Sequence, residues 1–466
     1  MRMRVSIGCK TLSPPAANEM GLTMTQTPDI MTPERSRTRF LDKSAAVMLG
    51  LTIFYIPFPY LTSLKEVLFY LPVTIAIGFL ATGKKAIRFQ QPLLTFLYIF
   101  AAWALLTAFF SLDPKASFND VFFHLIKYIL YCYALLTVMA SRARFRSITW
   151  ILFISGCVFA AELMVRFYLL ENRSITLRLG GFGLTEISTN LIAVVTAVAF
   201  VFGLQLYSRS KIAVTRFGVI LGLVILAGVT ISTQSRAAFL ALIASGTVYM
   251  FFRGQRAFIA VSLLLVALAA TFYMIRSQVG TFSGIGSYRT NVRISLGLMA
   301  IDVTNDYPIT GIGFGTDIFG TRIDHEMYNE RLPEPFRRSP SNLKSHTTEP
   351  HATFFSIAVR TGWPGLVFFC LFIGSFFRVC IRLIRSSADE EITSWAQCLM
   401  ASMVTMLVVG IFERCLSPVT DMVFYTIVGM VGILWQLDAS SDDIAYRKIQ
   451  SSPIERVEEN PLLKQP

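Results

Sequence analysis

Apolar stretches of about 20 residues recur along almost the whole of this 466-residue chain, and they constrain its fold more than any other feature. A helix of about 20 apolar residues is long enough to cross the hydrocarbon core of a bilayer. Charged residues make up 15% of the chain, whereas soluble domains contain about a quarter. The sequence therefore predicts an all-α membrane protein with many spans.

We predict about twelve transmembrane helices, with approximate bounds 44–62, 66–82, 91–111, 120–140, 148–170, 184–207, 217–234, 237–252, 257–276, 364–381, 393–412 and 420–437. The first nine fall in residues 44–276 and the last three in 364–437. Residues 1–43 are expected to form a disordered cytoplasmic tail, and 438–466 a second cytoplasmic tail. A large loop, 277–363, separates spans nine and ten.

Basic residues indicate the orientation of these spans. The alternate short connections hold fourteen Lys and Arg residues on one side and six on the other. Because basic residues mark cytoplasmic connections, the richer set and both tails are expected in the cytoplasm. The loop 277–363 and the connections that hold Arg178 and Arg236 then face outward, which for a bacterial inner membrane is the periplasm.

Composition and motifs argue against several other functions. A net charge of +13 would suggest nucleic acid as the partner of a soluble protein. Here the cytoplasmic connections explain that charge, so no nucleic-acid partner is expected. The seven cysteines lie mostly singly in apolar runs without a C-x-x-C pair, which argues against a disulfide framework or a zinc site. The sequence contains no G-x-x-x-x-G-K-S nucleotide loop.

The loop 277–363 is too long to be structureless, so we expect it to contain interfacial helices of its own. The run RTNVRISLGLMAIDVT carries apolar residues at helical spacing and predicts a helix that lies against the membrane. In DYPITGIGFGTDIFG, Gly311, Gly313 and Gly315 superficially resemble a phosphate-binding loop, but no strand–turn–helix context supports that reading. We interpret these glycines as a turn that packs the loop against the membrane helices.

Four arginines are expected on the outer side: Arg178, Arg236, Arg289 and Arg293. Any one of them alone could be solvated or could face lipid phosphates. Together they point to an anionic partner, because the charge bias of membrane proteins disfavours basic residues on this side. The planar guanidinium binds phosphate oxygens in pairs, and a lipid-linked phosphate or pyrophosphate is the natural anion at this depth.

The stretch SHTTEPHATFFSIAVRTGWPG contains His351 where a polar segment becomes apolar. Thr347 or Thr348 as a cap, followed by Pro350, predicts a short helix that begins here and is broken at GWPG. His351 would lie in its first turn, where the positive helix end favours a neutral imidazole able to act as a base. The alternative is that His351 only caps the helix. The other histidines, His124, His325 and His346, have less suggestive surroundings.

Three segments resemble the superfamily of O-antigen ligases and O-antigen polymerases, which are bacterial membrane glycosyltransferases. They are STQSRAAFLAL, RISLGLMAIDVTNDYPITGIGFG and EPHATFFSIAVRTGWPGLVFF, and they cover roughly residues 230–370. They match the family's Ser-Arg turn, its Arg…Pro-x-x-Gly-x-Gly segment and its Pro-His helix followed by Gly-x-x-Gly. The family often has Asn after the histidine, where this chain has Ala352, so one hydrogen-bonding group is lost.

The resemblance implies a GT-C-like enzyme that moves a glycan from undecaprenyl pyrophosphate to an acceptor hydroxyl, such as that of lipid A–core, without cofactor or metal. It implies that His351 is the base and that Arg236 binds pyrophosphate, with Arg293 and Arg178 in support. The residues themselves agree with this chemistry, since an imidazole can accept the hydroxyl proton and arginines can stabilise a departing diphosphate. A single attack from the opposite face would invert the anomeric centre. Glu349 is the alternative base, and His351 would then position the acceptor.

Two rival functions stay open at this stage. A polymerase of the same family would join one lipid-linked glycan to another, and the motifs do not separate it from a ligase; the stretch around His351 looks closer to ligases. A transporter or flippase is a different class, and it usually places ionisable residues near the bilayer midplane. We expect Lys127, Arg166 and Arg360 to lie near outer helix ends and to extend outward, which disfavours transport.

Overall fold

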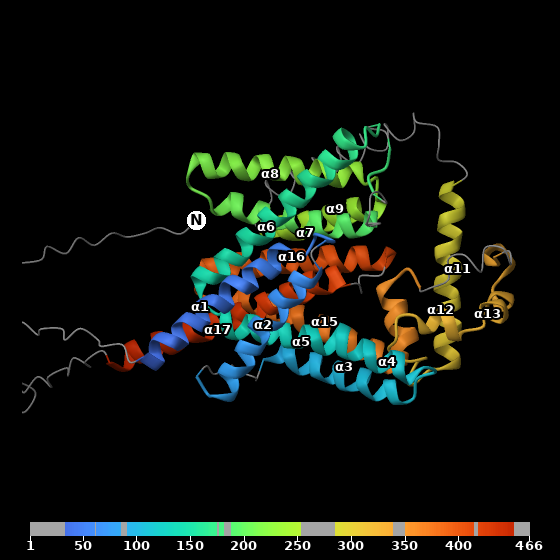
Figure 1. The fold of residues 1–466 in the computed structure, drawn as a ribbon, viewed down its shortest axis with the longest axis horizontal. Coiled ribbons are helices and arrows are strands. Elements are labelled where there is room, and N and C mark those ends of the chain that lie inside the picture. The colour runs from blue at the N-terminus through green and yellow to red at the C-terminus, as the bar shows by residue number, and fades with distance from the viewer. Residues whose placement is uncertain are drawn as a thin grey trace, which may run out of the picture. The chain divides into compact units, whose positions relative to one another are not determined.

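The computed structural model describes residues 33–60, 62–84, 91–174, 177–180, 188–252, 285–338, 350–413 and 418–451. The chain forms two compact units, Met1–Phe40 and Leu41–Pro466, and all contacts that position the site lie within the second. Every regular element in the described ranges is helical. In chain order these are α1 (Pro33–Phe54), α2 (Thr62–Ala81), α3 (Pro92–Phe109), α4 (Pro114–Asp120), η1 (Val121–Ile126), α5 (Lys127–Val138), α6 (Arg142–Met164), η2 (Val165–Leu170), α7 (Thr189–Arg209), α8 (Ala213–Ser232), α9 (Arg236–Phe251), α11 (Ile285–Asp306), α12 (Ile318–Arg322), α13 (His325–Arg331), η3 (Glu334–Phe336), α15 (Thr353–Ser386), α16 (Glu390–Phe412) and α17 (Pro418–Ser451) (Figure 1).

The predicted class, an all-α membrane protein, is confirmed. Among the described residues, nine helices are long and apolar enough to cross a membrane. The number twelve stays a prediction. The predicted span 44–62 overlaps α1, which begins at Pro33 inside the expected tail. The predicted span 237–252 matches α9, which has 16 residues. The predicted span 257–276 lies outside the described residues. At the other end of the chain, α17 continues to Ser451, beyond the boundary predicted at 437.

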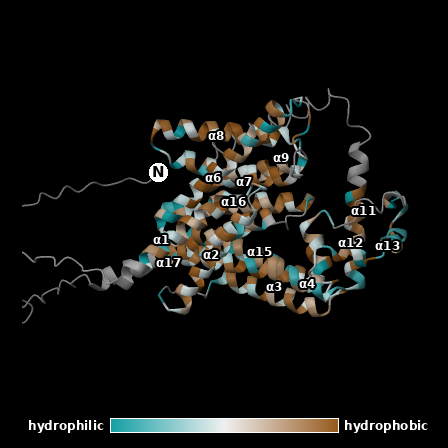
Figure 2. Ribbon diagram, viewed as in Figure 1, coloured by the Kyte–Doolittle hydropathy of each residue, from teal (hydrophilic) through white to brown (hydrophobic). Residues whose placement is uncertain are grey.

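The helices differ in how much of their surface the protein covers. Only 28% of the apolar window of α8 is buried, against 72% for α16. Large side chains on α8 such as Val214, Phe217 and Val224 are exposed, and Figure 2 shows the strongly hydrophobic character of this helix. Apolar surface of this extent requires a covering in water, and lipid tails provide it in a membrane. Therefore α8 faces lipid, whereas α16 lies in the interior of the helix packing.

Side-chain caps fix where several helices begin. The hydroxyl groups of Ser141, Ser188 and Ser235 accept hydrogen bonds from backbone N–H groups in the first turns of α6, α7 and α9, and the Asp389 carboxylate does the same for α16. Such caps satisfy backbone donors that have no partner within the helix. The cap at Ser235 makes Arg236 the first residue of α9.

One end of the helix packing, here called the Asp389 end, is held by ion pairs. Arg142 pairs with Asp389 at 2.6 Å, Arg146 with Glu391 and Arg144 with Asp42. Nearby, Gln205 of α7 donates to Ser394 of α16 at 2.6 Å and accepts from Tyr249 of α9 at 2.7 Å.

Since Tyr249 is near the end of α9 and Ser394 near the start of α16, these two packed helices are antiparallel. The first residue of α9, Arg236, and the residue after α16, Glu413, therefore share the opposite end. We call it the Glu413 end.

At the Glu413 end, residues 285–338 form a small helical layer with its own core. Leu296, Met299, Ala300 and Val303 of α11 pack on Phe319 and Tyr328, among other residues of that layer. The helix predicted from RTNVRISLGLMAIDVT is confirmed, and its position against the membrane stays a prediction. Arg322 of α12 donates to Asp113 at 2.9 Å, and this bond lowers the pKa of that carboxyl. The bond ties the layer to the connection between α3 and α4.

The glycines 311 and 313 join this layer to the membrane helices, as predicted. Both have positive φ, 62° and 110°. Their backbone passes so close to its neighbours that a Cβ at Gly311 would meet the Val359 carbonyl, and one at Gly313 would meet Ser111. Between them, the Ile312 N–H donates to Val359 O at 2.9 Å, and Ile312 O accepts from the Leu112 N–H at 3.0 Å.

Helix α15 contains the predicted break but begins later than predicted. Its first residue is Thr353, after the N-cap Ala352, so Pro350 and His351 precede the helix. The break falls at Gly362, with φ 70° and ψ −179°. The expected cap residues Thr347 and Thr348 lie outside the described residues.

Candidate functional site

Glu413 brings two of the predicted site residues together. One carboxylate oxygen lies 3.5 Å from Nδ1 of His351, and the other lies 3.4 Å from Nη2 of Arg293. The Glu413 main-chain oxygen also accepts from the Thr353 hydroxyl at 3.2 Å. One residue at the end of α16 thus joins α11, which carries Arg293, to the start of α15.

The local sequence explains how His351 reaches this carboxylate. Ala352, directly before α15, and Glu413, directly after α16, both have extended backbone. His351 is therefore not in the first turn of a helix, as we expected, but two residues before it. Its side chain is 39% exposed, so the imidazole is accessible to solvent while its Nδ1 faces the Glu413 carboxylate.

This geometry suits proton transfer. A carboxylate at Nδ1 favours the tautomer with its proton on Nδ1, although that proton is inferred from the partner and not seen. The other nitrogen, Nε2, then carries a lone pair that can accept a proton from a substrate. The carboxylate also stabilises the imidazolium that forms, as the acid does in a Ser-His-Asp triad.

Arg178 and Arg236 are both connected to the turn between α8 and α9. Nε of Arg178 donates to Thr233 O at 3.0 Å, and the neighbouring Leu179 N–H donates to Ser232 O at 2.9 Å. These bonds fasten residues 178–179 to the turn between α8 and α9. Arg236 follows that turn directly, and its side chain is exposed. One predicted anion-binding arginine thus begins α9, and another is bonded to the turn that precedes it.

The two remaining predicted residues cannot be placed. Arg289 belongs to α11, but its side chain lies outside the described residues. Glu349, the alternative base, also lies outside them. Glu413 was not among our predictions, although it is the acid that contacts both His351 and Arg293. The only signal for it in the sequence is its position in a short polar connection between two spans.

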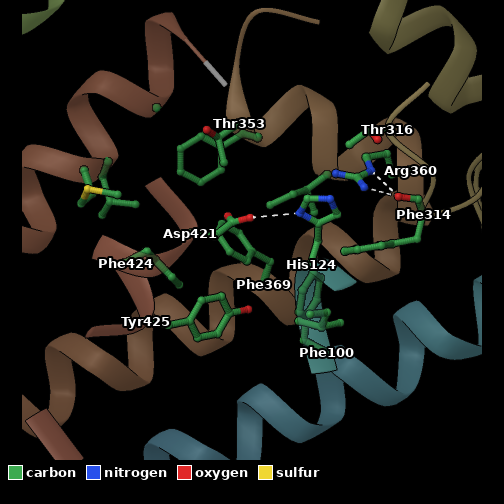
Figure 3. Close-up of a pocket in the computed structure, with 16 residues that line it drawn as sticks. Phe100, His124, Phe314, Thr316, Thr353, Arg360, Phe369, Asp421, Phe424 and Tyr425 are labelled. Carbon is green, nitrogen blue, oxygen red and sulfur yellow. Dashed lines mark hydrogen bonds and ion pairs between the residues drawn. The ribbon is translucent and has the colours of Figure 1, made fainter. Parts of the chain in front are cut away.

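A cavity that shares Thr353 with this cluster contains polar groups that we also did not predict (Figure 3). Nδ1 of His124 points to the Asp421 carboxylate at 3.5 Å, and Arg360 lies on another wall of the cavity. Thr353 contributes to both places, because its hydroxyl bonds Glu413 and its side chain lines the cavity. Ionisable residues inside apolar spans are by default candidates for function, and this signal at His124 was available in the sequence.

Our expectation for Arg360 was wrong. The side chain does not extend outward but is buried, with Nε donating to Phe314 O at 2.7 Å and the guanidinium 4.3 Å from the Phe314 ring centroid. Nη2 lies 3.7 Å from Asp120, which accepts from the Thr316 N–H at 2.6 Å. A buried guanidinium needs such partners. These partners include residues 314–316, so Arg360 lies where the layer meets the helices rather than at mid-depth.

His325 illustrates a histidine with a structural role. It packs against Phe319 and places Nδ1 3.3 Å from the Met299 sulfur. Burial lowers its pKa below the ordinary value. A lowered pKa in the folded state means that the neutral ring contributes stability above about pH 6.5, and that this stability is lost as the pH falls.

We therefore expect the layer formed by residues 285–338 to open more readily at pH 5.5 than at pH 7.5. Hydrogen exchange of its peptides, corrected for the intrinsic rate at each pH, measures this difference. The matched variant His325→Gln cannot titrate and should show a smaller dependence on pH. An unchanged dependence in that variant would assign the effect to other groups.

Comparison with known proteins gives one finding. No curated protein matches the chain. Residues 221–370 match a family model described as O-antigen ligase. The matched range runs from α8 to the first part of α15 and includes Arg236, Arg293 and His351, but not Glu413. With its many apolar helices the chain is a multi-pass membrane protein, and residues 221–370 of it are similar to the O-antigen ligase family.

Proposed function

We propose that the protein is a glycosyltransferase that moves a glycan from undecaprenyl pyrophosphate to an acceptor hydroxyl such as that of lipid A–core. The reaction takes place at the Glu413 end, which faces the periplasm when the protein lies in the bacterial inner membrane. The family match supports an enzyme of the membrane glycosyltransferase type. The observation that carries the proposed mechanism is the contact of Glu413 with both His351 and Arg293.

In this mechanism Nε2 of His351 accepts the proton of the acceptor hydroxyl as its oxygen attacks the anomeric carbon. The bond from that carbon to the pyrophosphate oxygen breaks, and undecaprenyl pyrophosphate leaves with the electron pair. Attack from the face opposite the leaving group inverts the anomeric centre. The Glu413 carboxylate stabilises the resulting imidazolium. Glu349 stays the alternative base.

Arginines stabilise the negative charge that gathers on the leaving diphosphate. Arg236 at the start of α9, Arg178 bonded to the turn before it, and Arg293 of α11 are the arginines that would bind this diphosphate. The contact with Glu413 involves only Nη2 of Arg293, and a guanidinium has five N–H donors, so the same side chain can also bind a phosphate oxygen. Fixed charges of this kind do work that Mg²⁺ performs in many phosphoryl sites.

The test is transfer by purified protein in detergent or liposomes, with a lipid pyrophosphate-linked glycan as donor. Arg236→Gln is expected to lower kcat/KM by about 10–100-fold, since a hydrogen bond to a charged group contributes about 1.5–3 kcal/mol. Arg216→Gln is the matched control. Arg216 is also an exposed arginine, but it lies near the start of α8, whereas the end of α8 is the one that lies at the Glu413 end. Chelation by EDTA should leave the rate unchanged. Loss of transfer on chelation, or equal effects of the two substitutions, would contradict the arginine mechanism.

Glycan analysis of a deletion strain separates a ligase from a polymerase. For a ligase, lipid A–core lacks polymer while lipid-linked polymer accumulates. For a polymerase, lipid A–core carries single repeats. We propose the ligase, because the family model is described as O-antigen ligase.

A further inference from the structure

The cavity beside the Glu413 cluster is partly open and has a volume of about 50 Å³. It lies between η1, α15 and the first turns of α17, with residues 314–316 on one wall. Since one water needs about 10–15 Å³ of such space, it holds a few waters or the hydroxyl groups of one larger molecule. Its link to the cluster is Thr353, which lines the cavity and bonds Glu413.

The polar groups of the cavity come from elements far apart in the chain. Asp421, in the first turn of α17, is buried, and its carboxylate faces His124. His124 lies in the π-helical turn η1, and such turns are rare and frequently found at functional sites. Arg360 and Thr316 also line the cavity and add a guanidinium and a hydroxyl, which are bonded to Phe314 O and Asp120.

The rest of the lining is aromatic. Phe100, Phe354, Phe369 and Phe424 surround the polar groups, as Figure 3 shows for those it labels. Tyr425 is fixed by stacking on Tyr128 at 5.6 Å between ring centroids. Ligand sites combine such apolar walls with a few polar groups that orient the ligand.

We propose that this cavity binds one edge of a sugar ring of the substrate glycan, with its hydroxyl groups in place of the waters. A sugar edge suits both kinds of lining, because its hydroxyls bond the carboxylate and the imidazole while its C–H faces contact aromatic rings. A lipid tail would leave His124 and Asp421 without polar partners from the ligand. A phosphate would meet the carboxylate of Asp421, which carries the same sign of charge. The proposal rests on the proposed function, because it takes the bound molecule to be the glycan that is transferred or the one that accepts it.

Equilibrium binding to the full-length protein in detergent tests the proposal without requiring turnover. Three probes are compared: undecaprenyl pyrophosphate carrying the glycan, the same carrier without sugar, and the free acceptor glycan. Asp421→Asn keeps the size of the side chain but removes the charged acceptor. It is expected to weaken binding of the first or the third probe by about 10-fold or more, and the affected probe tells whether the sugar belongs to donor or acceptor.

His124→Gln should act on the same probe, and both variants should leave binding of the sugarless carrier unchanged. The matched control is Glu162→Gln, an acid paired with Arg166 that does not line the cavity; it should change none of the three. Equal weakening of the sugarless carrier, or wild-type affinities in both cavity variants, would overturn the proposal. Transfer is measured separately. Sugar-dependent binding without transfer would reject the proposed function, whereas transfer with unchanged affinities in the variants would reject the sugar site.

Discussion

Replacing His351 by alanine is expected to lower kcat for glycan transfer by about 10²–10⁴, the usual contribution of a general base. KM for the lipid-linked donor should change little, because in the proposed mechanism arginines rather than the imidazole hold the pyrophosphate. The measurement is steady-state transfer by purified protein at saturating acceptor. The prediction rests on the Glu413 carboxylate, which lies 3.5 Å from Nδ1 of His351 and leaves Nε2 as the nitrogen proposed to accept the proton.

Two further variants separate catalysis from positioning. Glu413→Gln keeps the shape of the side chain but removes its charge, and it should cause a smaller loss because the base is still present. Glu349→Gln should be close to wild type. If His351→Ala keeps wild-type activity while Glu349→Gln abolishes it, the base is Glu349 and the role given to His351 is wrong.

Replacing Gly362 by alanine should lower the stability of the fold by about 3 kcal/mol or more. The backbone at Gly362, with φ 70° and ψ −179°, belongs to a region that is costly for other residues. An added Cβ would also meet the backbone carbonyls of Ile309 and Pro308, which are not free to retreat. Thermal unfolding in detergent and limited proteolysis of residues 285–338 measure the two expected consequences, a lower Tm and faster cleavage.

Gly374 provides the control on the same helix. An added Cβ there has no atom within 4 Å, so Gly374→Ala should be neutral or slightly stabilising, by about 0.5–1 kcal/mol. If Gly362→Ala is as stable and as resistant to protease as Gly374→Ala, the tight packing at the bend does not hold the layer in place.

Local patterns in the sequence were sufficient for much of the fold. Hydrophobic run length predicted the nine helices in the described residues that are long and apolar enough to cross a membrane, and helical spacing predicted α11. The sequence GWPG identified the bend at Gly362, because Gly and Pro interrupt a helix in a way that depends on adjacent residues alone. The late start of α15 was missed because the Thr and Pro residues before it are equally typical of a cap two to five residues earlier.

The remaining parts of the site depend on contacts between distant segments. Glu413 lies 60 residues from Thr353, whose hydroxyl it binds, and nothing next to it in the sequence marks it as a partner of an imidazole. Arg360 is buried only because Phe314 O and Asp120 come to it from other elements. Such pairings are set by tertiary packing, which periodicity does not report.

The bend in α15 also bears on which parts of the protein can move. A helix interrupted at Gly362 leaves main-chain groups that its own turns no longer use, and each has a new partner: Thr361 O accepts from Trp103, Val359 O from Ile312, and the Trp363 N–H donates to Pro308 O. A rotation of the chain about Gly362 would break these three hydrogen bonds together, and each buried group left unpaired costs about 1–3 kcal/mol. The bend at Gly362 is therefore expected to stay rigid and not to act as a hinge between α15 and residues 285–338.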